Sequence, residues 1–190
     1  MIYIISADNR RRYHHLLTEM HRQRKAVFID KMGWPLEDIA GLEMDCYDRE
    51  DALYLIESET SLGGVIASAR LIPTTRPHLL GERFADLCER APPSGANVWE
   101  ATRFCPAPET PPGAARKAVL GRMIAAIMET ALLFGIEQIV YIADPVLAPM
   151  ADAAGWTVRA LGAPRGRGRN KVQAFAAEID AIGVRRVRER

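Results

Sequence analysis

The amino-acid sequence predicts a mixed α/β (or α+β) fold in which helices cover the faces of one mixed sheet. Three observations support this prediction. Short apolar segments bounded by glycine, proline or acidic residues are typical of strands. Two of these segments flank a Gly63-Gly64 turn and predict an antiparallel hairpin. Two others flank a long apolar helix, and such a strand–helix–strand crossover beside a hairpin predicts a mixed sheet. The 190 residues have the length of one domain.

The first half of the chain predicts a strand, a helix and a hairpin. Residues 1–6 are apolar and predict the first strand. Apolar side chains recur at helical spacing over 13–28, and we expect Asp8-Asn9 to cap this helix. An acid-rich loop follows. The two hairpin strands are predicted at 52–56 and 65–72.

The second half predicts one long helix between two strands, together with shorter elements. The helix, over 115–134, is apolar around much of its circumference, which is typical of a largely buried helix, and Gly135 ends it. We assign residues 1–180 to one domain and 181–190 to a basic C-terminal tail. The other predicted elements are a short helix at 77–90, strands at 98–104 and 139–143, a short helix at 146–154, and strands at 156–161 and 171–179.

Composition excludes several classes of protein. With 48% hydrophobic and 26% charged residues, the chain is typical of a globular protein rather than a disordered or fibrous one. No apolar stretch is long enough to span a bilayer, so we expect no membrane association. Cys46, Cys88 and Cys105 lack the spacing of a metal site and cannot all pair with one another, which favours a reducing cytoplasm.

Positive charge is concentrated near the C-terminus. From Trp156 onward the chain has nine Lys or Arg and three Asp or Glu, although its net charge is only +1. This region is either a solvated surface or a docking patch for an acidic partner. Nucleic acid would be such a partner, but no helix-turn-helix is predicted and aromatic residues do not alternate with the basic ones. We therefore expect no nucleic-acid binding.

A constellation of charged and aromatic side chains extends over residues 24–104. Its members are Arg24, Phe28, Trp34, Asp45, Asp48, Arg70, Phe84, Glu100 and Arg103. In type, order and separation these residues resemble the acyl-homoserine lactone synthases of the LuxI type, also called autoinducer synthases, and Gly155-Trp156 adds to the resemblance. One such residue alone is weak evidence, whereas nine in the right order make the resemblance specific.

The resemblance implies a fold similar to that of the N-acetyltransferase (GNAT) superfamily, in which two central strands splay apart to admit the pantetheine arm of a thioester. It also implies the reaction. An acyl group passes from acyl carrier protein or acyl-CoA to the amine of S-adenosylmethionine, whose carboxylate then attacks its own side chain. Methylthioadenosine leaves, and the lactone closes to give a quorum-sensing signal. S-adenosylmethionine is thus a substrate, and no cofactor is implied.

Catalytic roles are expected on the strand at 98–104. The amine of S-adenosylmethionine arrives mostly protonated, so the reaction needs a base, and Glu100 is the candidate, directly or through a water molecule. On charge pairing alone, Glu100 could instead be a structural partner of Arg103. The Thr102 hydroxyl and the backbone near Thr102 and Arg103 are candidates for polarising the thioester carbonyl.

The N-terminal part of the constellation is expected to bind S-adenosylmethionine. Trp34 and Phe28 suit its sulfonium and adenine ring, because aromatic faces attract cations and stack on bases, although Phe28 also continues the buried stripe of the helix. The acids and arginines are expected to pair in a network that orders this region and contacts the cationic substrate. The expected substrate-binding residues are Arg24, Phe28, Trp34, Asp45, Asp48, Arg70 and Phe104.

Two other kinds of chemistry are conceivable in the acid-rich loop. Asp45 and Asp48 could bind a metal, but no histidine or third acid accompanies them at a suitable spacing, so we expect no metal. Cys46 could carry the acyl group covalently. Its neighbouring carboxylates disfavour the thiolate form, so direct transfer is favoured.

The acyl chain is expected in an apolar tunnel lined by the long helix and the strand at 139–143. Met123, Ile127, Val140 and Ile142 are the expected lining residues, although most residues of this kind belong to an ordinary core. Tyr141 supplies the only hydroxyl of that strand, which indicates no dedicated contact for a 3-oxo group. The length of the acyl chain stays open.

An N-acyltransferase that uses acyl-CoA on another amine is the main alternative. Such enzymes bind the CoA pyrophosphate with an Arg/Gln-x-x-Gly-x-Gly/Ala loop at a helix start. Residues 110–117 lack this pattern, which argues against a tightly held pyrophosphate without excluding a CoA donor. An acidic carrier protein would be complemented by Arg165, Arg167, Arg169 and Lys171. The choice of donor stays open.

Overall fold

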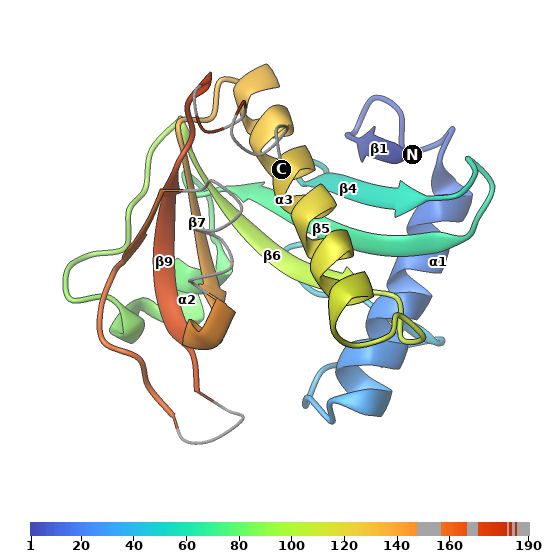
Figure 1. Ribbon diagram of the computed structural model, residues 1–190, viewed down its shortest axis with the longest axis horizontal. Coiled ribbons are helices and arrows are strands. Elements are labelled where there is room, and N and C mark those ends of the chain that lie inside the picture. The colour runs from blue at the N-terminus through green and yellow to red at the C-terminus, as the bar shows by residue number, and fades with distance from the viewer. Residues whose placement is uncertain (148–156, 167–170, 182, 184, 186–190) are drawn as a thin grey trace. The chain divides into compact units, whose positions relative to one another are not determined.

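The structure, a computed structural model, describes residues 1–147, 157–166, 171–181, 183 and 185 (Figure 1). It consists of two compact units. The first comprises Met1–Leu71 and Arg103–Met123, and the second comprises Ile72–Thr102 and Ile124–Arg190. Three elements contribute residues to both units, namely β5 (Val65–Pro73), β6 (Val98–Pro106) and α3 (Ala114–Leu133).

An antiparallel sheet forms the centre of the first unit. Its strands are β1 (Ile2–Ile5), β4 (Leu53–Ser58) and β5, and β4 lies between the other two (Figure 1). All six residues of β4 are buried, which explains its nearly continuous apolar sequence. Gly64 has a φ of 79° in the predicted hairpin turn between β4 and β5, where a side chain would be strained. The predicted hairpin is therefore confirmed.

One helical segment packs its apolar side chains in the first unit. It consists of α1 (His14–Arg24) and the π-helix η1 (Lys25–Lys31), which follows without a break. The prediction that Asp8-Asn9 caps this helix is wrong. Helix α1 begins after Tyr13 without a side-chain cap, and the Asn9 amide instead bonds the backbone of the turn that precedes the helix.

The acid-rich loop contains a small hairpin that the sequence did not predict. Its strands are β2 (Asp38–Ile39) and β3 (Leu42–Glu43). Ala40 and Gly41 both have positive φ, 53° and 85°, as a two-residue turn of type I′ requires. Strands of two residues are too short to show an alternation of apolar and polar side chains, so the sequence carries no signal for them.

Four strands form the sheet of the second unit, in the order β6, β7 (Gln138–Ala143), β9 (Gln173–Glu178) and β8 (Val158–Ala160). The crossover helix α3 joins β6 to β7, which pair in parallel, while β9 runs antiparallel to both of its neighbours. The predicted mixed sheet is confirmed. Pairing of β6 with β7 covers Val98–Ala101 against Gln138–Tyr141, although both strands continue further. They are thus paired over their first part, as the expected splayed pair requires.

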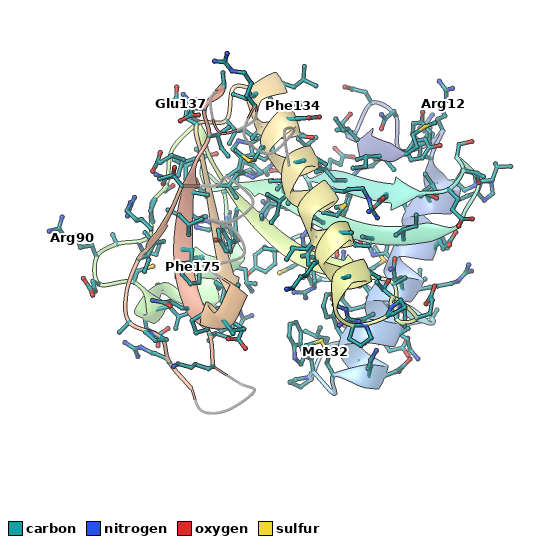
Figure 2. All side chains as sticks on the ribbon, viewed as in Figure 1. Arg12, Met32, Arg90, Phe134, Glu137 and Phe175 are labelled. Carbon is teal, nitrogen blue, oxygen red and sulfur yellow. The ribbon has the colours of Figure 1, made fainter. Side chains whose placement is uncertain are left out.

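The apolar core of the second unit lies where two short helices meet its sheet. The helices are α2 (Leu79–Arg83) and η2 (Ala85–Leu87), which replace the single helix predicted at 77–90. They bury Leu80 and Leu87 against Val140, Ala174 and Ala176. Phe175, labelled in Figure 2, stacks on Tyr141 with ring centroids 5.4 Å apart. Alternate residues of β7 and β9 therefore pack in two different layers.

Strand β6 changes its alternation at one residue. Arg103 has a φ of 54°, which is unusual for a residue with a side chain. Buried side chains fall on even-numbered positions before it, at Glu100 and Thr102, and on odd-numbered positions after it, at Cys105 and Ala107. A single residue in the left-handed region thus shifts the pleat by one position, as in a β-bulge.

Several sequence expectations lie wholly or partly outside the described residues, among them Gly155-Trp156 and the start of the strand predicted at 156–161. The helix predicted at 146–154 overlaps η3 (Pro145–Leu147), whereas residues 148–156 are not described. Of the predicted tail at 181–190, residues 181, 183 and 185 are described. Within the described part of the chain, no helix combines the length and the apolar composition needed to cross a bilayer.

Candidate functional site

Three arginines and three carboxylates meet in the first unit. Each arginine comes from a different element, namely the end of α1, β5 and the second half of β6, and the carboxylates come from β3 and the loop after it. We call these six residues the charge network: Arg24, Arg70, Arg103, Glu43, Asp45 and Asp48. Asp45, the most exposed of their side chains, is only 18% accessible.

Asp48 has the largest number of partners. Arg24 Nη1 and Nη2 donate to its two carboxylate oxygens at 2.8 and 3.0 Å, the two-point geometry that suits a guanidinium. Arg70 Nη1 lies 2.8 Å from Oδ1, and the Tyr54 hydroxyl donates to the same oxygen at 2.8 Å. The backbone N–H of Asp45 donates to Oδ2 at 2.9 Å. These partners explain how a carboxylate remains charged at 2% exposure.

Asp45 links the second and third arginines. Arg70 donates to both of its carboxylate oxygens, at 2.6 and 3.0 Å, and Arg103 Nη2 lies 2.8 Å from Oδ2. The Arg70 guanidinium also lies over the Tyr47 ring, 5.8 Å from its centroid. Four residues that the sequence predicted to pair, Arg24, Arg70, Asp45 and Asp48, are thus together in the structure.

Glu43 is a member that was not predicted from the sequence. Its carboxylate is fully buried and accepts hydrogen bonds from Arg24 Nε and from Arg103, whose Nη2 donates to Oε1 at 3.0 Å. The His21 ring lies 2.9 Å from the Glu43 carbonyl through Nδ1. The spacing of Glu43 and Asp45 could have indicated its membership. The two are two residues apart, and side chains at this separation in an extended chain lie on the same side.

Burial and charge pairing act in opposite directions on the network's protonation. Burial alone would raise the pKa of Asp48, but the hydrogen bond with Arg24 and the charges of Arg70 and Arg24 outweigh it and lower that pKa far below its usual range. The pKa of Asp45 is lowered in the same way, chiefly by Arg70 against the effect of burial. Burial lowers the pKa of His21, and the charge of Arg24 adds to this effect. The two aspartates are thus held as carboxylates beside a neutral imidazole.

A stacked aromatic pair lies beside the network. The rings of Phe28 and Trp34 are nearly parallel, with centroids 5.0 Å apart and planes at 9°. Phe28 is buried with Val27 and Cys105, while Trp34 is 42% exposed. The Arg103 guanidinium lies 5.7 Å from the centroid of Phe28. Phe28 therefore belongs to the core and to the site at once, and Trp34 offers an accessible ring.

Glu100 lies in the second unit, where it is fully buried. Its carboxylate accepts hydrogen bonds from the backbone N–H groups of Leu79 and Leu80, at 2.8 and 2.7 Å, and so binds the first turn of α2. Arg103, its alternative structural partner from the sequence, pairs with Glu43 and Asp45 instead. Thr102 is also buried, and Phe104, the neighbour of Arg103 on β6, is half-buried.

The residues expected around the acyl chain lie in different surroundings. Val140 and Ile142 belong to the core of the second unit, with Leu80 and Leu87, and Phe84 packs against the same cluster. Met123 and Ile127 are buried on α3, and neither is a member of that cluster. Val140 and Ile142 therefore pack in one core cluster, of which Ile127 is not a member.

The basic residues expected to meet an acidic partner are only partly described. Arg165 donates to Asp86 at 3.0 Å, and both side chains are largely exposed. Lys171 is exposed, whereas Arg167 and Arg169 lie outside the described residues. Among the side chains that are described, no group of His, Cys, Asp and Glu is arranged to hold a metal ion.

The arrangement as a whole suits recognition of a charged, aromatic substrate. Within the network the guanidinium and carboxylate charges are balanced, which fixes the arginines in place at low exposure. The aromatic pair beside it presents the face of Trp34, which attracts a cation or stacks on a base.

Comparison with known proteins shows the family of this chain. The family model for the autoinducer synthase matches residues 8–187. The isovaleryl-homoserine lactone synthase of Bradyrhizobium diazoefficiens is 34% identical over 166 residues, covering 86% of this chain and 73% of that protein. The acyl-homoserine-lactone synthase of Acinetobacter nosocomialis is 31% identical over 155 residues, which are 78% of this chain and 84% of that protein.

Solved structures agree in fold. The structure of BjaI, a CoA-dependent acyl-homoserine lactone synthase with SAM and isopentyl-CoA, has a TM-score of 0.90 at 31% identity and covers 100% of this chain and 88% of that one. A protein from Lactobacillus plantarum assigned as an N-acetyltransferase has a TM-score of 0.56 at 20% identity, which extends the similarity in fold to the expected GNAT type. The resemblance inferred from residues 24–104 is confirmed, and this chain belongs to the autoinducer synthase family.

Proposed function

We propose that this chain is an acyl-homoserine lactone synthase, an acyltransferase that joins an acyl group to the amine of S-adenosylmethionine and closes the lactone with release of methylthioadenosine. The observation that carries the proposal is the charge network beside the Phe28–Trp34 stack, in a chain of the autoinducer synthase family. Relatives over most of its length are named as such synthases, and BjaI was solved with SAM and isopentyl-CoA.

S-adenosylmethionine is the substrate that suits the first unit. Its sulfonium and adenine both favour an aromatic face, which Trp34 supplies and Phe28 supports from behind. Arg24, Arg70, Asp45 and Asp48 hold the segment that borders this pair, and Phe104 follows Arg103 on β6. We assign substrate binding to these residues.

Acyl transfer requires removal of a proton from the amine, and Glu100 is the base we propose. Its carboxylate, held by hydrogen bonds from Leu79 and Leu80, takes the proton directly or through water. The neutral amine attacks the thioester carbonyl, and the oxyanion that forms is stabilised by Thr102 and the backbone near Arg103, where the positive φ reorients the strand. Collapse of this intermediate expels the thiolate.

Lactone closure is the second step. The carboxylate of the acylated substrate attacks the carbon next to the sulfonium, and the bond from that carbon to sulfur breaks, so methylthioadenosine leaves as a neutral molecule. The step neutralises a positive and a negative charge, so it is favoured in surroundings that exclude water. The buried side chains of the charge network and of Phe28 border the proposed position of the substrate.

The acyl donor is an acyl thioester. Acyl-CoA is supported by the CoA dependence of BjaI, and acyl carrier protein is supported by exposed basic side chains of the second unit. Among them are Arg83, Arg90, Arg159, Arg165 and Lys171, and Arg90 points away from the ribbon in Figure 2. We propose Val140, Ile142, Met123 and Ile127 as acyl-pocket residues, and a single synthase domain at 1–180. The three free cysteines support a cytoplasmic location.

The test is synthesis in vitro. Purified protein is incubated with S-adenosylmethionine and a series of acyl-CoA thioesters, and mass spectrometry measures both acyl-homoserine lactone and methylthioadenosine. Each acyl group is then offered on acyl carrier protein. Equal amounts of both products support the proposal. The donor that gives the higher rate, acyl-CoA or acyl carrier protein, is then the preferred substrate. Acylation of another amine without methylthioadenosine would instead indicate an N-acyltransferase, and no product from any donor would contradict the proposal.

A further inference from the structure

We infer that Tyr54 is a positioning residue for the reaction, which orients Arg103 through the charge network. The inference rests on the proposed function and assigns a role to a buried hydroxyl outside the residues that border the substrate. Tyr54 is 1% exposed, so it does not itself touch a substrate. Its influence has to pass through the residues that it contacts.

The series of contacts that leads from Tyr54 to Arg103 begins with Arg70 and Asp48. The two residues are opposite each other in the register of β4 and β5, so their side chains lie on the same face of the sheet. Both donate to one atom: the Tyr54 hydroxyl and Arg70 Nη1 each lie 2.8 Å from Oδ1 of Asp48. Two residues of the sheet thus hold Oδ1 of this carboxylate, in addition to its contacts with Arg24 and with the backbone of Asp45.

Two series of contacts connect Asp48 and Arg70 to Arg103. Asp48 fixes Arg24 through a two-point contact, and Arg24 in turn bonds Glu43. On the other side, Arg70 holds Asp45 through two hydrogen bonds. Glu43 and Asp45 are the two carboxylates that hold the Arg103 guanidinium, at 3.0 and 2.8 Å from Nη2. Both routes from Tyr54 thus end on Arg103.

The Tyr54 ring is itself held from two sides. The Arg10 guanidinium lies 5.2 Å from its centroid, and Arg10 Nη2 also donates to the carbonyl of Ala52 at 3.0 Å. The His21 ring meets Tyr54 edge-on at 6.1 Å, and His21 bonds the carbonyl of Glu43. Arg10 and His21, which contact the Tyr54 ring, therefore also bond the backbone at Ala52 and Glu43, on either side of Asp45 and Asp48.

The hydroxyl is suited to act as a permanent donor. Burial raises the pKa of Tyr54, and the negative charge of Asp48 raises it further, so the phenol keeps its proton over the pH range of the enzyme. Removing this donor leaves a buried carboxylate oxygen with one partner fewer while the ring still fills its place.

The experiment compares Tyr54→Phe with Tyr13→Phe, a control whose ring contacts the tilted ring of Tyr3, at 5.4 Å between centroids, outside the network. We measure kcat and KM for S-adenosylmethionine with an acyl-CoA donor, together with the urea midpoint. A hydrogen bond to a charged group carries enough free energy for a loss of about tenfold in kcat/KM in Tyr54→Phe, and none in the control. Unchanged kcat/KM with a lower urea midpoint would reduce Tyr54 to a stabilising role and overturn the inference.

A double-mutant cycle with Arg103→Lys tests the route. If Tyr54 acts through Arg103, Tyr54→Phe lowers kcat/KM by less than about twofold once Arg103 is replaced, because neighbouring effects in one network are not additive. The same loss in both backgrounds would refute the route. Calorimetry then measures the affinity of the wild type and of each variant for S-adenosylmethionine in the absence of turnover. A wild-type protein that binds it and yet forms no lactone would refute the proposed function, separately from the role of Tyr54.

Discussion

The Glu43 carboxylate accepts a hydrogen bond from Nη2 of Arg103 at 3.0 Å and also binds Arg24, so a two-residue strand joins the end of α1 to β6. Neutralising Glu43 leaves three guanidinium groups with two carboxylates at low exposure, because Arg24 and Arg103 keep Asp48 and Asp45 as their partners. We expect Glu43→Gln to lower the free energy of unfolding by about 3 kcal/mol in urea titrations. Glu59→Gln, at an exposed position, is the matched control and should change it by less than about 0.5 kcal/mol. An equal effect of the two substitutions would contradict the role of Glu43.

The lowered pKa of Asp48 predicts acid sensitivity. Its pKa is lower in the folded than in the unfolded chain, so its stabilising contribution is complete above the unfolded pKa of about 4 and is lost as the pH falls toward the folded pKa. Urea titrations from about pH 5 downward should show this loss. In Asp48→Asn, the stability at neutral pH should be lower and its decrease below about pH 4 smaller. A decrease as steep as in the wild type would rule out Asp48 as its source.

His21 predicts a second, milder pH dependence. Its pKa is lowered by burial and by Arg24, so below the unfolded value of about 6.5 the unfolded chain binds a proton that the folded chain resists. Stability should therefore fall as the pH drops below about 6.5. His21→Asn keeps an N–H donor for the Glu43 carbonyl and should remove this slope. His15→Asn, on the exposed side of α1, should preserve it.

Glu100 can be tested by substitution with glutamine. If Glu100 is the base, Glu100→Gln should lower kcat by at least about 100-fold. The amide also presents an N–H group toward the two backbone donors of α2, so we expect a loss of stability of about 1–2 kcal/mol in the same protein. Glu89→Gln, at an exposed position, is the control. An unimpaired rate for Glu100→Gln would remove this residue from the mechanism.

Cys46 should be dispensable. Its side chain is exposed in the acid-rich loop, whereas burial raises the pKa of Cys105 to about 12 and makes that thiol unreactive. Cys46→Ser should therefore retain kcat/KM within about twofold in the lactone assay. Loss of activity with preserved far-UV circular dichroism would revive a covalent acyl-cysteine route.

The long elements could be predicted from the sequence because their patterns are repeated many times. The helix expected at 115–134 is α3, at Ala114–Leu133, and the hairpin at 52–72 is β4 and β5. The π-helix η1 and the hairpin β2–β3 could not be predicted. The first differs from an α-helix by a hydrogen-bond shift that leaves no mark on apolar spacing, and the second depends on two residues with positive φ.

The sequence predicted which residues belong to the charge network better than it predicted which of them pair. Residues such as Arg24 and Asp48 could be named from type and order, but which carboxylate meets which arginine depends on the fold. Glu43 was missed because it lies outside the pattern that was matched. Pairing of Glu100 with Arg103 was the alternative to its role as a base, on charge alone, whereas each of the two has its own partners in the structure.

That change of pleat has a consequence for protein engineering. Strand β6 contains two frames of alternation, one ending at Thr102 and the other starting after Arg103. A segment exchanged with a relative must keep both frames, since a transplant without the extra position would turn Cys105 outward and its neighbour Phe104 or Pro106 inward. Chimeras joined within β6 are therefore constrained by the spacing between Glu100 and Cys105 more strictly than by the identities of the residues between them.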